Sequence, residues 1–118
     1  MRTGIMLEQG DVVLIPIPFT DLSSQKRRPV VVISNNDYNR KTQDVVVVAM
    51  TSNPEEIDYS FTVTTNDLEK GTLKRSSRIR VDKIYTLSQS IVVQNFGRVK
   101  TPTLERIRRT LQELTSKK

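Results

Sequence analysis

Short runs of β-branched residues, separated by turn-forming segments, constrain the fold of this chain more than any other feature. The clearest runs are DVVLIPIP at 11–18, VVVIS at 30–34, DVVVVAMT at 44–51 and YSFTVTT at 59–65. Stiff β-branched side chains favour extended strands. The segments between them are rich in Asn, Asp, Ser and Pro, which favour turns. The pattern predicts a sheet of several short strands.

Individual runs indicate how the strands lie. The unbroken apolar run at 44–51 predicts a strand that is buried on both faces. Pro16 and Pro18 lack backbone donors, so we expect the end of the first strand to lie at a sheet edge. The segment NNDYNRKTQ at 35–43 is rich in turn formers and is predicted to be a connection.

Further strands follow in the second half of the chain. In the segment LKRSSRIRV, Ile79 and Val81 mark an inner face, and Arg78 and Arg80 mark the other face. The segment YTLSQSIVVQNFGRV at 85–99 is predicted to supply one or two more short strands.

The last part of the chain has the period of a helix. Thr101 is the expected N-cap and Pro102 fits the first turn. An apolar stripe follows at spacings of 3, 4 and 3 and consists of Leu104, Ile107, Leu111 and Leu114. Such a stripe is typical of an amphipathic helix that docks on a sheet. The chain is therefore predicted to be mainly β (α+β), a small, mostly antiparallel barrel or sandwich with a C-terminal helix.

The length of 118 residues suits one domain with one core, which we expect to span residues 1–118. No stretch approaches the roughly 20 apolar residues of a membrane span, and the first residues lack a signal-peptide pattern. The chain has no cysteine, so its fold requires no oxidising compartment. A cytoplasmic location without membrane contact is the expectation.

The absence of histidine and cysteine restricts the chemistry. Histidine is the commonest general base and a usual zinc ligand, and this chain has none. Without thiolates there is no Cys-based metal site either. Any catalysis must use Arg, Lys, Asp, Glu, Tyr or hydroxyl groups, which rules out most familiar hydrolase designs. We expect no metal and no cofactor.

Charge is distributed unevenly along the chain. Residues 1–69 carry 6 basic and 10 acidic side chains, a net charge of −4, whereas residues 70–118 carry 13 basic and 3 acidic, a net charge of +10, which together give +6. This asymmetry favours a polyanionic partner such as nucleic acid. The alternative interpretation is a solubilising surface.

The first candidate site is the cluster Lys26, Arg27 and Arg28. The guanidinium presents a planar fork of donors that matches phosphate oxygens. Pro29 follows and biases Arg28 towards an extended backbone, which gives its side chain a defined direction. The cluster is interpreted as a phosphate clamp, and the alternative is a solvated charged loop.

The second candidate is the hydroxyl pair Thr51 and Ser52, at the end of the predicted buried strand. Such hydroxyls donate hydrogen bonds to a ligand, or alternatively cap the turn that follows.

The third candidate is a basic segment that contains Arg78 and Arg80 and is predicted to bind an RNA or DNA backbone. Aromatic residues make up 5% of the chain, which argues against a broad base-stacking platform. Tyr38, Tyr59 and Tyr85 could each stack one base.

In chain order, the segments GDVVLIPIPF, KRRPVVVIS and VVVVAMTS resemble the MazF/PemK (Kid) family of ribosome-independent endoribonuclease toxins. The later segment RVDKIYTL is similar to the central strand of that family, and the resemblance extends from Gly10 to the terminal helix. It implies a compact SH3-like barrel with a C-terminal helix, a homodimer, and the toxin part of a type II toxin-antitoxin system.

The resemblance also implies an activity. Members of the family cleave single-stranded RNA, typically mRNA, at short motifs without a metal, and a cognate antitoxin neutralises them. Arg28 and Thr51 occupy the positions of the family's catalytic residues. Attack by the RNA's own 2′-hydroxyl would need no histidine. Substrate contacts are then expected from Lys26, Arg27, Ser52, Arg78, Arg80 and Asp21.

One departure concerns the loop TDLSSQK. Many relatives carry a Gly-Glu pair there, whereas the only carboxylate of this loop is Asp21. The alternative to an enzyme is a non-cleaving binding module on the same barrel. It would be an RNA-binding relative or a gyrase-targeting toxin, although the absence of Trp and the ending ELTSKK disfavour the latter.

Overall fold

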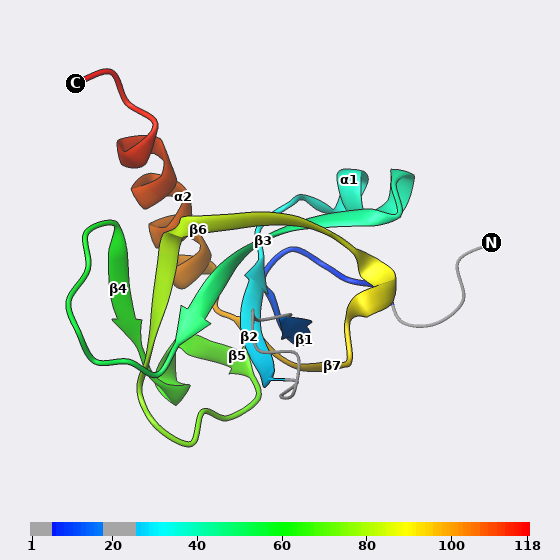
Figure 1. The fold of residues 1–118 in the computed structure, drawn as a ribbon, viewed down its shortest axis with the longest axis horizontal. Coiled ribbons are helices and arrows are strands. Elements are labelled where there is room, and N and C mark those ends of the chain that lie inside the picture. The colour runs from blue at the N-terminus through cyan, green and yellow to red at the C-terminus, as the bar shows by residue number, and fades with distance from the viewer. Residues whose placement is uncertain (1–5, 18–25) are drawn as a thin grey trace.

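The computed structural model describes residues 6–17 and 26–118 (Figure 1). In chain order, the elements are β1 (Asp11–Ile17), β2 (Lys26–Val32), α1 (Asn36–Lys41), β3 (Asp44–Thr51), β4 (Ser60–Val63), the 3₁₀ turn η1 (Thr65–Asp67), β5 (Leu68–Lys70), β6 (Ser77–Ser88), the 3₁₀ turn η2 (Gln89–Ile91), β7 (Gln94–Val99) and α2 (Thr101–Leu114).

The strands form a single seven-stranded sheet in the order β4-β6-β3-β2-β1-β7-β5. Every pairing is antiparallel. The sheet curls into a half-barrel, with α2 packed beside the β6 and β4 end (Figure 1). The prediction of a mainly β, antiparallel fold with a C-terminal helix is therefore confirmed.

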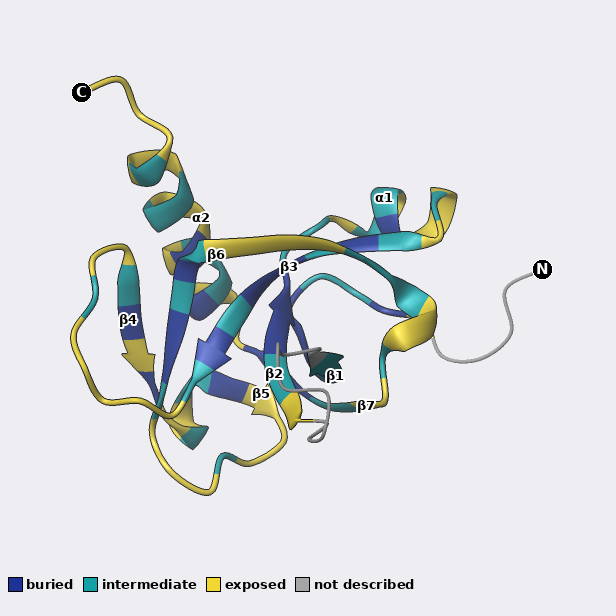
Figure 2. Ribbon diagram, in the orientation of Figure 1, coloured by how far each residue is buried: buried dark blue, intermediate teal, exposed yellow. Residues whose placement is uncertain are grey.

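The two faces of the sheet bury separate apolar clusters. Strand β3 contributes to both, because Val45 and Val47 belong to one cluster and Val48 and Met50 to the other. Alternate side chains of a strand point to opposite faces, so this is burial on both faces, as the apolar run predicts. Figure 2 shows the contrast with the exposed second half of β6.

Helix α2 packs as its apolar stripe predicts. Ile107 is fully buried, and Leu104 and Leu111 pack against the same cluster. The predicted cap was wrong by one residue. Lys100 is the N-cap and makes no side-chain capping bond, while Thr101 is already helical. Pro102 lies in the first turn, where a missing backbone donor costs nothing.

The expected connection at 35–43 lies between β2 and β3, and it contains the helix α1, which the pattern did not predict. The side chain of Asn35 accepts a hydrogen bond from the backbone N–H of Tyr38 and so caps the helix. Asn39 is buried and donates to the carbonyl of Ser34 at 3.0 Å. This local bond and the long-range donation from Gln89 Nε2 to the Asn39 carbonyl at 2.8 Å hold a six-residue helix that would be unstable alone.

Two strand boundaries differ from the sequence pattern. Strand β2 begins at Lys26, before the β-branched run, because that segment pairs with β1. Strand β6 continues through residues 77–88, where two segments were expected.

Strand β1 lies inside the sheet, and only its C-terminal end has the character of the expected sheet edge. Pairing with β7 reaches Leu14, and beyond it Pro16 pairs with Arg27 of β2 on one side. The missing donor of Pro16 therefore falls where no β7 partner is paired. Pro18 lies outside the described residues.

A charged cluster fixes the start of β1 to β7. The Asp11 carboxylate, 1% exposed, accepts from Arg98 Nε at 2.9 Å, from Asn95 Nδ2 at 3.0 Å and from the backbone N–H of Glu8 at 2.8 Å. Glu8 also pairs with Arg98. Each charge of this cluster has an opposite charge or a donor beside it, so it stabilises the joint between β1 and β7.

Within the described ranges, no helix has the length and apolar character that crossing a bilayer requires.

Candidate functional site

Arg28 and Thr51 leave neighbouring strands on the same face of the sheet. Val30 of β2 lies opposite Ala49 of β3. Arg28 comes two residues before Val30, and Thr51 two residues after Ala49. Because side chains alternate between faces in an antiparallel pair, Arg28 and Thr51 share the face of Val30 and Ala49.

The next strand continues this arrangement. Thr51 lies directly opposite Arg78 of β6, and Arg78 lies opposite Thr62 of β4. Residues directly opposite share a face and have Cβ atoms about 4.5–5.5 Å apart. We call Arg28, Thr51 and Arg78 the cationic row. It crosses β2, β3 and β6 with the hydroxyl between the two guanidinium groups.

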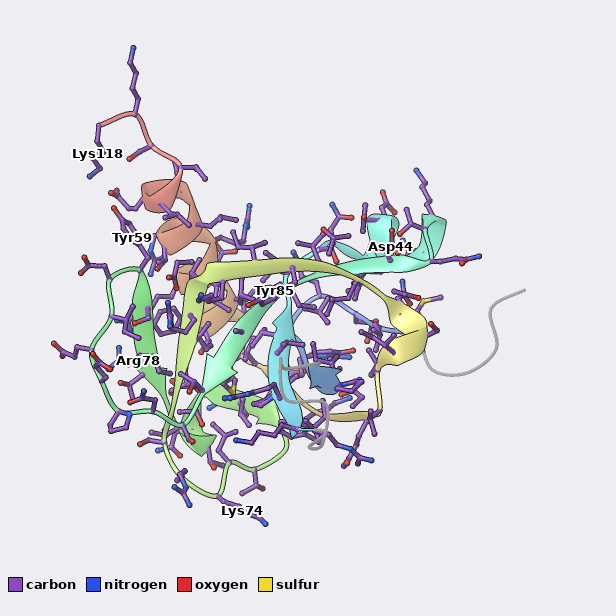
Figure 3. All side chains as sticks on the ribbon, in the orientation of Figure 1. Asp44, Tyr59, Lys74, Arg78, Tyr85 and Lys118 are labelled. Atoms are coloured by element: carbon purple, nitrogen blue, oxygen red, sulfur yellow. The ribbon has the colours of Figure 1, made fainter. Side chains whose placement is uncertain are left out.

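Arg78 is buried, with 9% of its surface exposed. Its Nη1 donates to Ser60 Oγ at 3.1 Å and its Nη2 to Thr62 Oγ1 at 3.3 Å. Its Nε is buried and has no acceptor. Figure 3 shows Arg78 next to β4, which provides both hydroxyls.

Arg80 lies on the same face but has an ionic partner. Its Nε donates to Asp82 Oδ1 at 2.9 Å and its Nη2 to Asp82 Oδ2 at 2.6 Å. The bond from Arg80 lowers the pKa of Asp82, and the same bond raises the pKa of Arg80. The basic segment therefore forms no continuous exposed stripe, since Arg78 is buried and Arg80 is paired.

Sequence reasoning missed Asp82. In the register, Ala49 faces Arg80 while Val48 faces Ile84, so residues 81–83 form a bulge in β6. Bulges re-aim side chains. The available signal was the separation of two residues between Arg80 and Asp82 in a predicted strand, which places both on one face.

The other predicted residues are distributed as follows. Lys26 alternates in step with Arg28 and shares its face, whereas Arg27 lies between them, opposite Pro16, and points to the other face. Ser52 is exposed directly after β3. Asp21 lies outside the described residues.

The hydroxyl of Thr51 already has a structural contact. Its Oγ1 accepts from the backbone N–H of Asn53 at 3.1 Å, which is the turn cap considered as an alternative. A hydroxyl that accepts still has a proton to donate. The cap orients Thr51 and leaves that proton for a ligand.

No cluster of three or more acidic side chains suited to a metal ion occurs in the part of the chain that the structure describes.

Comparison with known protein families shows which family the chain belongs to. A family model described as the PemK-like, MazF-like toxin of type II toxin-antitoxin systems matches residues 8–115. The chain belongs to the PemK/MazF toxin family. A search of curated proteins finds no match.

Solved structures agree with this family. The PemK/MazF chain is similar to an endoribonuclease from a mycobacterial species, with 25% identity, a TM-score of 0.72 and coverage of 92% of this chain and 90% of that one. It is also similar in fold to a chain of a MazE–MazF crystal structure from Deinococcus radiodurans, with 19% identity, a TM-score of 0.78 and coverage of 94% of this chain and 96% of that one. A third similar structure is a mycobacterial endoribonuclease in complex with its cognate antitoxin, with 22% identity, a TM-score of 0.70 and coverage of 91% and 92%.

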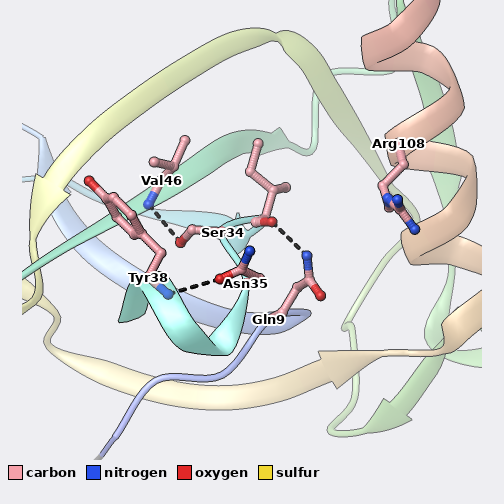
Figure 4. Close-up of a pocket in the computed structure, with 7 residues that line it drawn as sticks. Gln9, Ser34, Asn35, Tyr38, Val46 and Arg108 are labelled. Carbon is pink, nitrogen blue, oxygen red and sulfur yellow. Dashed lines mark hydrogen bonds between the residues drawn. The ribbon is translucent and has the colours of Figure 1, made fainter. Parts of the chain in front are cut away.

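A pocket of the PemK/MazF chain lies elsewhere (Figure 4). It is lined by Ser34, which follows β2, by Val46 near the start of β3, by Tyr38, and by Arg108 of α2. Val46 is five residues from Thr51, which is about 16 Å along a strand. Ser34 Oγ accepts from the Val46 N–H at 3.0 Å, and Arg108 pairs with Glu105. These polar groups are used within the protein.

Proposed function

We propose that this PemK/MazF chain is a sequence-selective, metal-independent endoribonuclease that cleaves single-stranded RNA, mRNA in particular. The observation that carries the proposal is the shared face of Arg28 and Thr51 on adjacent strands. Family membership gives the toxin class. The sequence-selective cleavage and its mechanism are our proposal.

The proposed reaction begins with the 2′-oxygen of the RNA as nucleophile. It attacks the adjacent phosphorus as its proton passes to water, and the bond from phosphorus to the 5′-oxygen breaks. The leaving 5′-oxygen takes a proton from water, so the products are a 2′,3′-cyclic phosphate and a 5′-hydroxyl. Arg28 holds the non-bridging oxygens and hydrogen-bonds the leaving 5′-oxygen, while Thr51 donates to the phosphate. Donors placed where charge develops contribute about 2.7–4 kcal/mol each to transition-state stabilisation.

Charged side chains next to the cationic row would also act on the reacting phosphate. Lys26, on the face of Arg28, and Arg80 attract the RNA backbone. Asp82 holds the Arg80 guanidinium in place through two hydrogen bonds. Because Arg80 lowers the pKa of Asp82, this carboxylate stays ionised at neutral pH. We assign it a positioning role. Arg27, Ser52 and Asp21 remain proposed RNA contacts.

The proposal includes partners. Residues 1–118 are proposed to act as one toxin domain in the cytoplasm and to be bound and neutralised by a cognate antitoxin. A similar endoribonuclease was solved in complex with its cognate antitoxin. An acidic antitoxin segment would complement the +10 net charge of residues 70–118. We also propose a homodimer, which is supported by large apolar side chains left exposed in β6, Ile84 at 41% and Tyr85 at 40%.

The test is incubation of the purified protein with a long, mixed-sequence single-stranded RNA in EDTA, followed by mapping of the new ends. We expect discrete cuts at a recurring motif, with 2′,3′-cyclic phosphate ends. The Arg28→Ala variant should lose at least about 100-fold in cleavage rate, because a transition-state donor is removed. Its unfolding midpoint should stay close to that of the wild type.

A matched RNA with 2′-O-methyl at the mapped position should bind and resist cutting. Efficient cleavage of that RNA would refute the 2′-hydroxyl mechanism. Cleavage by Arg28→Ala at the wild-type rate would refute the site. RNA that is bound and left intact by the wild type would instead favour the non-cleaving module.

A further inference from the structure

Arg78 differs from the other arginines that the structure embeds in the sheet. A guanidinium is charged at every ordinary pH. Arg80 has the Asp82 carboxylate, and Arg98 has Asp11 and Glu8. Arg78 is the most buried of the three, yet within the described ranges its partners are two neutral hydroxyls. Its Nε has no acceptor.

This arrangement leaves a buried charge without compensation. Neutral acceptors do not offset the desolvation of a cation, and a buried donor without an acceptor adds a further cost. An anion beside the guanidinium would supply the missing counter-charge. Among the residues that the structure describes, the environment of Arg78 therefore lacks one negatively charged partner.

The surroundings hold Arg78 ready for such a ligand. Ser60 donates its own proton to the carbonyl of Ile57, so a lone pair of its oxygen faces Nη1 of Arg78. Thr62 accepts from Nη2. Both hydroxyls fix the outer end of the guanidinium from β4 and leave the Nε edge without an acceptor.

The position of Arg78 indicates which anion it binds. Thr51 lies directly opposite on β3 and retains a hydroxyl proton, and Arg28 shares the face one strand further on. We infer that Arg78 binds a phosphate of the RNA backbone together with Thr51, from the side opposite to Arg28. Phosphate as the ligand rests on the proposed function, whereas the need for an anion rests on Arg78 itself.

The first experiment compares Arg78→Met with Arg109→Gln, an exposed helix cation outside the row, in thermal unfolding and RNA binding. Met resembles the aliphatic part of the arginine side chain and removes the charge. We expect Arg78→Met to raise the unfolding midpoint of the free protein, because an uncompensated charge is gone. It should weaken binding of an all-2′-O-methyl RNA about tenfold and lower the salt dependence of log K by about 0.7. Arg109→Gln should leave the midpoint unchanged.

The second experiment observes the group directly. Arginine Nε–Hε resonances are followed while ¹⁵N-labelled protein is titrated with inorganic phosphate and, separately, with the all-2′-O-methyl RNA. Assignment uses the Arg78→Met spectrum, in which one signal is missing. We expect the Arg78 signal to move downfield with both probes. Movement with phosphate but not with RNA would support the anion site and refute RNA as its source.

Failure of this inference differs from failure of the proposed function. If RNA is cut by Arg78→Met at the wild-type rate, and the Arg78 signal stays still with both probes, the inference is overturned and the nuclease stands. If Arg78→Met lowers the midpoint and keeps wild-type RNA affinity, Arg78 is a structural residue. If the wild type cuts no RNA but its Arg78 signal moves with phosphate, the inference stands and the nuclease fails.

Discussion

Arginine side chains near the two ends of the sheet differ in whether a carboxylate lies beside them. Near β7, Arg98 is bonded to Asp11 and Glu8, and Asp11 also accepts from Asn95. Near β4, Arg78 is more deeply buried than Arg98 and has hydroxyl partners alone within the described residues. The same residue type is satisfied at one end and left short of a negative charge at the other.

This difference distinguishes buried charges that stabilise the fold from buried charges that are available to a ligand. A fold that compensates each buried ion gains a rigid joint. A fold that leaves one uncompensated loses stability, and such losses concentrate at sites that bind ligands. The sheet thus has a structural end at β1 and β7, and the proposed function puts the binding end at β2, β3 and β6.

Breaking the structural end should give the largest effect. Asp11→Ala leaves Arg98 with the more exposed Glu8 and Glu69 and removes three accepted hydrogen bonds. We expect the free energy of unfolding to fall by about 3 kcal/mol, as for other broken buried pairs, measured by urea denaturation. Asp37→Ala removes the acid of an exposed pair with Arg40 and serves as the control, with a change of at most about 0.5 kcal/mol. Equal losses in both variants would contradict a structural role for the buried cluster.

Changing the binding end should reduce activity and cost the fold little, because the turn-capping bond that Thr51 accepts from the Asn53 N–H is exposed to solvent. Thr51→Val keeps the shape of the side chain and removes its hydroxyl. We expect kcat/KM for RNA cleavage to fall about 100-fold, which is about 2.7 kcal/mol, because the phosphate loses a donor. Thr86→Val, on the exposed part of β6, is the matched control and should cut normally. If Thr51→Val cuts RNA as fast as Thr86→Val, the Thr51 hydroxyl caps the turn and has no role in cleavage.

The smallest expected effect is on the dependence of folding stability on pH in the acid range. Since the pKa of Asp82 is lowered in the folded protein, its pairing with Arg80 stabilises the fold fully above the ordinary carboxyl value of 3.8. That contribution is lost as the pH falls through the lowered pKa. We expect Asp82→Asn to remove a contribution of at most about 1 kcal/mol, seen as a flatter decline of stability below pH 4. An unchanged profile would show that the pair adds nothing to stability.

Much of the fold follows from local pattern. The β-branched runs specify β1, β3 and β4, and the apolar stripe specifies α2, because these signals lie within each segment. Helix α1 was missed since its stability comes from the buried Asn39 and its contact with Ser34, a contact that polar composition does not reveal. The start of β2 at Lys26 likewise depends on pairing with β1.

The residues of the candidate site could be predicted from the sequence, but their burial and hydrogen-bond partners could not. The sequence places Arg28 and Thr51 at strand ends, and the register puts them on one face. The burial of Arg78 could not be read from its neighbours in sequence, because β4 supplies Ser60 and Thr62. The role of Asp82 also depends on a bulge that only the pairing with β3 reveals.

The pairing of β1 with β7 joins residues far apart in the chain, with Asp11 opposite Arg98. Closing so long a loop is slow, and a chain made on a ribosome emerges from its N-terminus at about 5–20 residues per second. Arg28 and Thr51 therefore leave the ribosome several seconds before β7 can complete the sheet that supports them. A toxin built on this topology becomes competent only after β7 has been synthesised, well after Arg28 and Thr51 have emerged.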